Sequence, residues 1–111
     1  MNKTLNEWSQ SFHKTAVEKG FWDNYDDAPN EFICTKLALI HSEVTEVLEA
    51  IRKNKSEEEV MAEFADILIR TLDLVSGMNE RYFKEYQSID LAVRLKTEKN
   101  SDRPRLHGNN F

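Results

Sequence analysis

The chain has 111 residues, 40% of them hydrophobic, which suits one domain with its own core, at a size where small domains gain from a partner. Its formal net charge of −5 disfavours sequence-independent binding of nucleic acid through the phosphates. Cys34 is the only cysteine and the first ten residues lack the apolar run of a signal peptide, so we expect a cytoplasmic protein. The longest apolar stretch, residues 60–75, contains charges that exclude a transmembrane helix, so we expect no membrane association.

Helices are the regular elements that the sequence predicts, because glycine and proline are few and no strand-like alternation persists. The first helix spans about residues 4–19, since Thr4 and Glu7 have the spacing of a capping box. The second spans about residues 29–53 and starts with Pro29, a residue favoured in the first helical turn.

The third helix is predicted over about residues 57–76. Ser56 opens it as the first residue of a second capping box, and Gly77 is expected to end it. The fourth helix is predicted over about residues 80–99, and a polar, basic tail follows at 100–111. We therefore predict an all-α fold with a four-helix-bundle-like arrangement.

Two pairs of carboxylates interrupt the apolar faces of the second and third helices. The pairs are Glu43 with Glu46, and Glu63 with Asp66. At 100° per residue, each pair falls in a sector about 80° wide that borders apolar positions. Because the join between the helices is short, the helices should be antiparallel neighbours, and the two sectors can face each other across one cleft.

Four carboxylates in a partly desolvated cleft repel one another unless a cation neutralises them. An oxygen-only ligand set suits Mg²⁺, with Mn²⁺ as a substitute, better than zinc. For any single helical glutamate, a solvated position or an ion pair is the better explanation, and Arg70, Lys36 and Arg52 are available as partners. The doubled pattern reverses this preference and favours the metal site.

The two acidic pairs resemble the signature of MazG-like nucleoside triphosphate pyrophosphohydrolases, which is Glu-Glu-x-x-Glu on one helix and Glu-x-x-Asp on the next. Here the motifs read Ser42-Glu43-x-x-Glu46 and Glu63-x-x-Asp66. The segment "KTEKNSDRPRLHG" is similar to the Lys, Asn and Arg-Pro ending of small members. Because Ser42 replaces the first glutamate of the signature, the number of bound metal ions is open.

The resemblance covers about residues 30–108 and implies one all-α domain over the whole chain, assembled as a homodimer or homotetramer. It also implies Mg²⁺-dependent hydrolysis of (deoxy)nucleoside triphosphates to the monophosphate and pyrophosphate, as house-cleaning of the nucleotide pool. Mg²⁺ held by Glu43, Glu46, Glu63 and Asp66 would neutralise the triphosphate and lower the pKa of a bound water. We favour Glu46 as the base, with Glu43 as the other candidate.

Cations that can hold the substrate are concentrated near the carboxyl end, where residues 94–107 contain five Lys or Arg and two acidic residues. Lys96, Asn100 and Arg103 match the tail pattern of the family, and we expect them to contact phosphate or sugar. Lys36 shares the sector of the first acidic pair and is a further candidate.

A nucleobase needs a flat apolar partner. Trp22 lies in an acidic loop, and we expect it to touch the ligand, whereas Trp8 and Phe12 have the helical spacing of core residues. The three histidines are separated in the sequence, and we assign them no catalytic role.

Other functions stay open at this point. A related all-α pyrophosphohydrolase that acts on dUTP or phosphoribosyl-ATP would have a similar metal site. A non-catalytic helical interaction module would show neither Mg²⁺-dependent pyrophosphate release nor stabilisation by Mg²⁺. A ferritin-like di-iron bundle fits less well, because such sites use Glu-x-x-His pairs, and neither His13 nor His41 follows a glutamate at that spacing.

Overall fold

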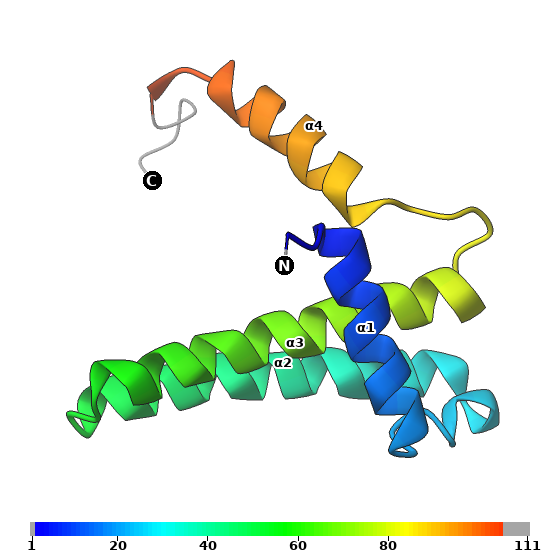
Figure 1. The fold of residues 1–111 in the computed structure, drawn as a ribbon, viewed down its shortest axis with the longest axis horizontal. Coiled ribbons are helices and arrows are strands. Elements are labelled where there is room, and N and C mark those ends of the chain that lie inside the picture. The colour runs from blue at the N-terminus through cyan, green and yellow to red at the C-terminus, as the bar shows by residue number, and fades with distance from the viewer. Residues whose placement is uncertain (1, 106–111) are drawn as a thin grey trace.

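The computed structural model describes residues 2–105, and all regular structure within them is helical (Figure 1). In chain order the elements are α1 (Leu5–Glu18), the short 3-10 helix η1 (Tyr25–Asp27), α2 (Pro29–Arg52), α3 (Glu57–Arg81) and α4 (Ile89–Ser101). The prediction of an all-α fold is confirmed. None of these helices combines the length and the apolar content needed to cross a bilayer.

Local capping fixes the starts of α1 and α3. The Thr4 hydroxyl accepts a hydrogen bond from the Glu7 amide at 3.1 Å, and the Glu7 carboxylate accepts one from the Thr4 amide at 2.8 Å. Ser56 and Glu59 make the same reciprocal pair. Each box satisfies amides that a helix start leaves without partners, so these starts agree with the prediction.

The predicted end of α3 is wrong. Gly77 does not stop the helix, which continues to Arg81. The glycine is buried under the indole of Trp22, and a Cβ at this position would overlap the ring. Gly77 therefore serves the packing of a ring against a helix, and its lack of a side chain has no role as a helix stop.

The predicted start of α4 is also wrong, because α4 begins at Ile89 and a non-helical connection precedes it. Asn79 holds this connection, donating to the Gln87 carbonyl at 3.0 Å and accepting from the Gln87 amide at 2.7 Å. Ser88 then caps the new helix by accepting from the Leu91 amide. The aromatic residues of this region are exposed: Tyr82, Phe83 and Tyr86.

The beginnings of α1 and α4 are tied together by hydrogen bonds. The Asp90 carboxylate accepts from the amides of Leu5 and Asn6 at 3.0 and 2.9 Å. The Asn6 side chain in turn accepts from the Ile89 amide and donates to the Ser88 hydroxyl. Residues far apart in the sequence thus cap each other's helices, and a carboxylate is well placed at the positive end of α1.

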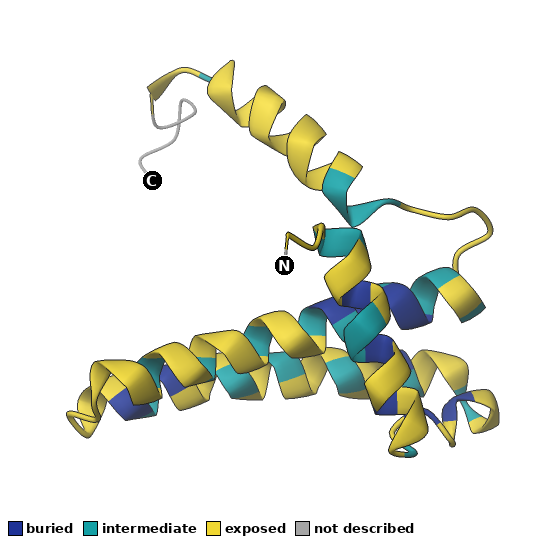
Figure 2. Cartoon of the chain, in the orientation of Figure 1, coloured by how far each residue is buried: buried dark blue, intermediate teal, exposed yellow. Residues whose placement is uncertain are grey.

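The helices α2 and α3 form an antiparallel hairpin, and α1 crosses α3 near one end of it (Figure 1). The main core lies at this crossing, where η1 also packs, and the far end of the hairpin is mostly exposed (Figure 2). The buried residues of this main core are Ala16, Trp22, Tyr25, Ile33 and Leu74. None of the residues of α4, Ile89–Ser101, is buried, and α4 leads away from the hairpin. The four helices therefore do not close into a bundle within one chain.

Candidate functional site

The hairpin brings three of the four predicted metal ligands together. Glu43 lies on α2, and Glu63 and Asp66 lie one turn apart on α3. One carboxylate oxygen from each lies within 4.8 Å of the others. Glu46, the predicted base and fourth ligand, is exposed and lies outside this group. We call Glu43, Glu63 and Asp66 the acidic cluster.

An internal cation already lies against the acidic cluster. The Nε of Arg70 donates to Oε1 of Glu43 at 2.7 Å. The Glu43 side chain is mostly buried, with 16% of its surface exposed, so this ion pair is screened by solvent less than a surface pair. Three carboxylates with one guanidinium leave a formal charge of two negative units, which one divalent cation would balance.

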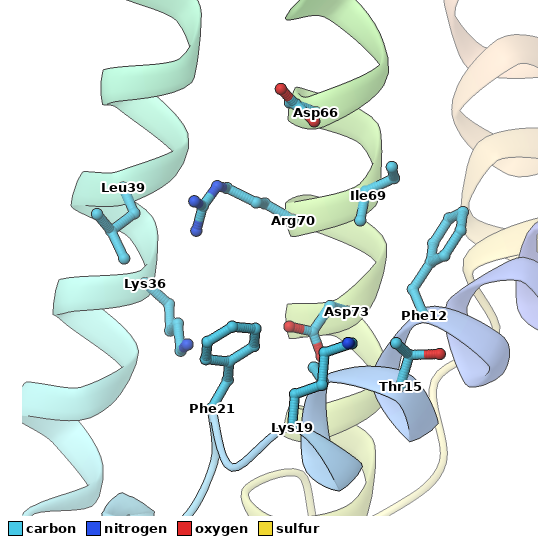
Figure 3. A pocket seen from close by; sticks show the side chains of 11 residues that line it. Phe12, Thr15, Lys19, Phe21, Lys36, Leu39, Asp66, Ile69, Arg70 and Asp73 are labelled. Carbon is cyan, nitrogen blue, oxygen red and sulfur yellow. The ribbon is translucent and has the colours of Figure 1, made fainter. Parts of the chain in front are cut away.

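A pocket of about 440 Å³ opens beside the acidic cluster, between α1, α2 and α3 (Figure 3). This volume lies in the range of small-molecule sites. Asp66 and Arg70 belong both to the cluster region and to the pocket wall. The other lining residues provide apolar and aromatic walls with a few polar groups: Phe12, Thr15, Ala16, Lys19, Phe21, Lys36, Leu39, Ile69 and Asp73.

Lys36 is half-buried in the pocket wall and makes no ion pair with residues 2–105. Its ammonium lies over the ring of Phe32 at 5.0 Å and also faces Phe21 and Trp22. Burial lowers the pKa of Lys36, the carboxylate of Asp73 acts in the opposite direction, and Arg70 adds to the lowering. A partly desolvated cation that faces a pocket is suited to an anionic or acceptor group of a ligand.

Sequence reasoning missed a buried polar network at the inner end of the pocket. Because an arginine can only donate, Nε2 of His13 must accept the 2.8 Å bond from Arg81 in the neutral ring, so its Nδ1 carries the proton. That Nδ1–H donates to Oδ1 of Asp73 at 2.7 Å, and the indole N–H of Trp22 donates to the same oxygen at 3.0 Å. Glu80 lies 3.3 Å from Nε2. The network fixes one oxygen of Asp73.

No pattern in the sequence is sufficient to predict this network. His13 stands alone in the sequence, and its partners on α3 are 60 or more residues away. Asp73 falls in the acidic sector of the third helix, so helical spacing does place it on the correct face. Its hydrogen-bond partners depend on how α1 crosses α3, which spacing does not define.

The structure places Trp22 in the core rather than in an open loop. Only 4% of its surface is exposed, and its ring packs between His13 and Phe32. Its neighbour Phe21, with 60% exposed, lines the pocket instead, together with Phe12. Trp22 therefore supports the pocket from behind, and the expectation that it touches the ligand from a loop does not fit its placement.

The predicted substrate contacts near the carboxyl end lie apart from the acidic cluster. Lys96 and Asn100 are exposed on α4, and Arg103 follows the helix and is partly buried. Spacing of 100° per residue places Lys96 and Asn100 on one face of α4, and Arg103 lies just beyond the end of the helix. Figure 1 shows α4 leading away from the hairpin. The end of the predicted tail, from residue 106, lies outside the described residues.

Comparison with protein families gave one match, and it covers most of the chain. The sequence model described as the MazG nucleotide pyrophosphohydrolase domain matches residues 33–107, which contain α3, α4, nearly all of α2 and the whole acidic cluster. Comparisons with curated proteins and with solved structures gave no match. The helix α1 and the loop before α2, which form one wall of the pocket, precede the matched region. The chain belongs to the family of MazG nucleotide pyrophosphohydrolase domains.

Proposed function

We propose that this protein hydrolyses nucleoside triphosphates, including deoxynucleotides, between the α and β phosphates, giving the monophosphate and pyrophosphate, as house-cleaning of the cytoplasmic nucleotide pool. Membership of the family supports nucleotide pyrophosphohydrolase activity in general. The observation that supports the finer statement is the position of the acidic cluster directly beside a pocket of suitable size, with Asp66 common to both.

The donor set of the acidic cluster fits Mg²⁺, or Mn²⁺ in its place. All three groups are carboxylates, and their oxygens converge from two helices. Glu43, Glu63 and Asp66 would hold the ion, with Glu46 next to them on α2. When bound, Mg²⁺ would supply charge neutralisation for the triphosphate and make a water easier to deprotonate.

The chain's own groups supply the remaining steps. Glu46 is proposed as the base, because it is one turn from Glu43, it is exposed and no ion pair within residues 2–105 occupies it, whereas Glu43 is held by Arg70. Arg70 lies in the pocket wall beside the acidic cluster and would bind phosphate oxygens, whereas Lys36, in the same wall, would donate to another acceptor group of the substrate.

The residues of the carboxyl end are proposed to act on a neighbouring copy. Lys96 and Asn100 share one face of α4, Arg103 follows the helix, and α4 leads away from the hairpin of its own chain. In a homodimer or homotetramer, α4 of one copy would bring these residues to the phosphates or sugar bound by another copy. The cationic face of α4 and the acidic cluster are complementary in charge, which favours this contact.

The direct test is a panel of nucleoside triphosphates with Mg²⁺, in which pyrophosphate and orthophosphate are measured separately. We expect pyrophosphate as the product, and no turnover in the presence of a chelator. A protein that releases orthophosphate would contradict cleavage between the α and β phosphates. Including dUTP and phosphoribosyl-ATP in the panel tests whether the protein prefers one of these two substrates, as related all-α pyrophosphohydrolases do. Absence of turnover together with absence of stabilisation by Mg²⁺ would favour the interaction module.

A further inference from the structure

Asp73 presents one carboxylate oxygen to the pocket and uses the other for internal bonds. Oδ1 accepts from both His13 and Trp22, whereas Oδ2 has no hydrogen-bond partner among residues 2–105. No buried side-chain oxygen or nitrogen is left without a partner in this part of the chain, so Oδ2 is not fully buried, and Asp73 is one of the residues that line the pocket. The second oxygen is therefore available to a ligand.

The orientation of Asp73 is held from behind. Arg81 donates to His13, which fixes the ring form that donates to Asp73, and the guanidinium also stacks on Trp22 at 4.7 Å. Gly77 allows the indole to lie directly on α3. A carboxylate with one oxygen fixed by two donors cannot rotate freely to adapt to a ligand, which is the property that discrimination between ligands requires.

The distance along α3 is suitable for a nucleotide. Asp66 in the acidic cluster and Asp73 are seven residues apart on one helix face, a rise of about 10 Å. With the phosphates at the acidic cluster, the base would lie at the inner end of the pocket, between the rings of Phe12 and Phe21 (Figure 3). There Asp73 offers an acceptor, and Lys36, which lines the same pocket, offers a donor.

We propose that Asp73 selects the nucleobase, with Oδ2 accepting a hydrogen bond from an exocyclic amino group while Lys36 donates to the adjacent ring nitrogen. The preferred bases are then cytosine and adenine, which present this amino group beside a ring acceptor. Uracil and hypoxanthine present a carbonyl and a ring N–H at the same two places, so both contacts are reversed. This inference rests on the proposed function for the location of the phosphates.

The proposed selection of the nucleobase depends on residues that lie outside the matched family region. The residues that hold or flank Asp73 from α1 and the following loop, namely Phe12, His13, Phe21 and Trp22, all precede residue 33, where the match begins. The geometry around Asp73 thus depends on a segment that the family comparison does not describe.

The test compares binding of matched nucleotide pairs by titration calorimetry: dCMP against dUMP, and AMP against IMP. We expect the amino member of each pair to bind about 10- to 100-fold more tightly. In the other member, the Asp73 carboxylate would face a carbonyl oxygen and the Lys36 ammonium would face a ring N–H, so neither hydrogen bond could form. Equal affinity within both pairs, or tighter binding of the carbonyl members, would overturn the inference. Because monophosphate binding needs no turnover, this result is separate from the pyrophosphate assay, which tests the proposed function.

The variant Asp73→Asn sharpens the test, because its oxygen can still accept from His13 and Trp22 while an amide nitrogen replaces Oδ2. We expect the preference for dCMP over dUMP to disappear or reverse. Asp26→Asn, the same change at an exposed residue of η1, is the control and should keep the wild-type preference. A folded Asp73→Asn protein with an unchanged preference would reject Asp73 as the selecting residue. Should this variant fail to fold, the wild-type comparison of the two pairs decides alone.

Discussion

Asp66 belongs both to the acidic cluster and to the wall of the pocket, so it joins the place where a cation would bind to the place where a nucleoside would bind. Its carboxylate lies close to those of Glu43 and Glu63, and only one of the three has an ion-pair partner among residues 2–105. Like charges held this close oppose folding unless they are neutralised. A residue of this kind is expected to cost stability and to contribute to function.

The variant Asp66→Asn tests this expectation. Activity should fall by about 10²- to 10³-fold, the usual effect of removing a group that stabilises a transition state, while stability without metal stays equal or rises. Mg²⁺ should raise the melting temperature of the wild type, and this increment should shrink in the variant. The measurements are thermal unfolding with and without Mg²⁺ and pyrophosphate release. A variant that loses stability but keeps its turnover would show Asp66 to be a structural partner only.

The lowered pKa of Lys36 predicts how the stability of the protein depends on pH. Burial lowers its pKa below the ordinary lysine value of 10.5, so in the pH range just below 10.5 the unfolded chain binds more protons than the folded chain. The free energy of unfolding contributed by Lys36 therefore rises as the pH increases through this range. Lys36→Met removes the charged group and should be more stable than the wild type at pH 7, with the difference narrowing towards pH 10.

Thermal unfolding at a series of pH values measures this difference. The variant Lys14→Met, at an exposed position of α1, is the control and should show no such narrowing. A constant difference between Lys36→Met and the wild type at all pH values would mean that burial of the charge is not the cause.

At the scale of helices, the sequence correctly predicts the helix ends that are determined by contacts between nearby residues. Both capping boxes lie where the sequence indicates, because their partners are three residues apart. The start of α2 at Pro29 also agrees with the sequence, because the fixed φ of proline suits the first helical turn. The end of α3 depends on the contact of Gly77 with Trp22, and the start of α4 depends on the bonds of Asn79 to Gln87. These partners are distant in the sequence or outside a regular helix, so helical periodicity gives no signal for them.

The same reasoning explains the site. The acidic cluster was predicted because two motifs on an antiparallel hairpin must meet, and three of the four carboxylates do. The pocket wall from α1 was not predicted, since the crossing of α1 over α3 decides that Phe21 faces the pocket while Trp22 is buried. Adjacent aromatic residues in a loop have no periodicity that separates these two roles.

Gly77→Ala tests the role of this glycine in the packing of α3. A methyl group would overlap the indole of Trp22, and we expect a loss of about 1–3 kcal/mol in the free energy of unfolding, as for other overpacked sites. Propensity alone would predict the opposite, because alanine favours a helix interior over glycine. In a Trp8→Phe background, Trp22 is the remaining tryptophan, and its fluorescence emission should shift to longer wavelength in the glycine variant. A stabilised variant with unchanged emission would contradict this role.

At the scale of the molecule, one chain leaves much apolar surface uncovered. The far end of the hairpin exposes 47–65% of several large side chains, namely Leu48, Ile51, Met61, Phe64 and Leu68. Exposed apolar surface of this extent is typical of interfaces. Since one chain has a mass of 13.0 kDa, light scattering at micromolar concentration should give at least twice that value. A mass of one chain would contradict the oligomer and the proposed action of α4 on a neighbouring copy.

A mixing experiment tests that action directly. Arg103→Ala should mainly raise KM, because a long cation binds phosphate oxygens in both the ground state and the transition state. When Asp66→Asn and Arg103→Ala proteins are unfolded and refolded together, some sites combine an intact acidic cluster with an intact α4 from another copy. We expect activity at low substrate concentration that exceeds the sum of the two variants alone. Activity equal to that sum would mean that α4 does not act across copies.

The ion pair between Arg70 and Glu43 has a consequence for the order of biosynthesis. Because the guanidinium offsets part of the negative charge, the hairpin can form on a newly made chain before any metal arrives. If the acidic cluster holds Mg²⁺ as proposed, the folded protein would take up the ion last, and a shortage of magnesium would leave inactive but correctly folded molecules. Refolding rates that are the same with Mg²⁺ and with a chelator would be the kinetic sign of this order.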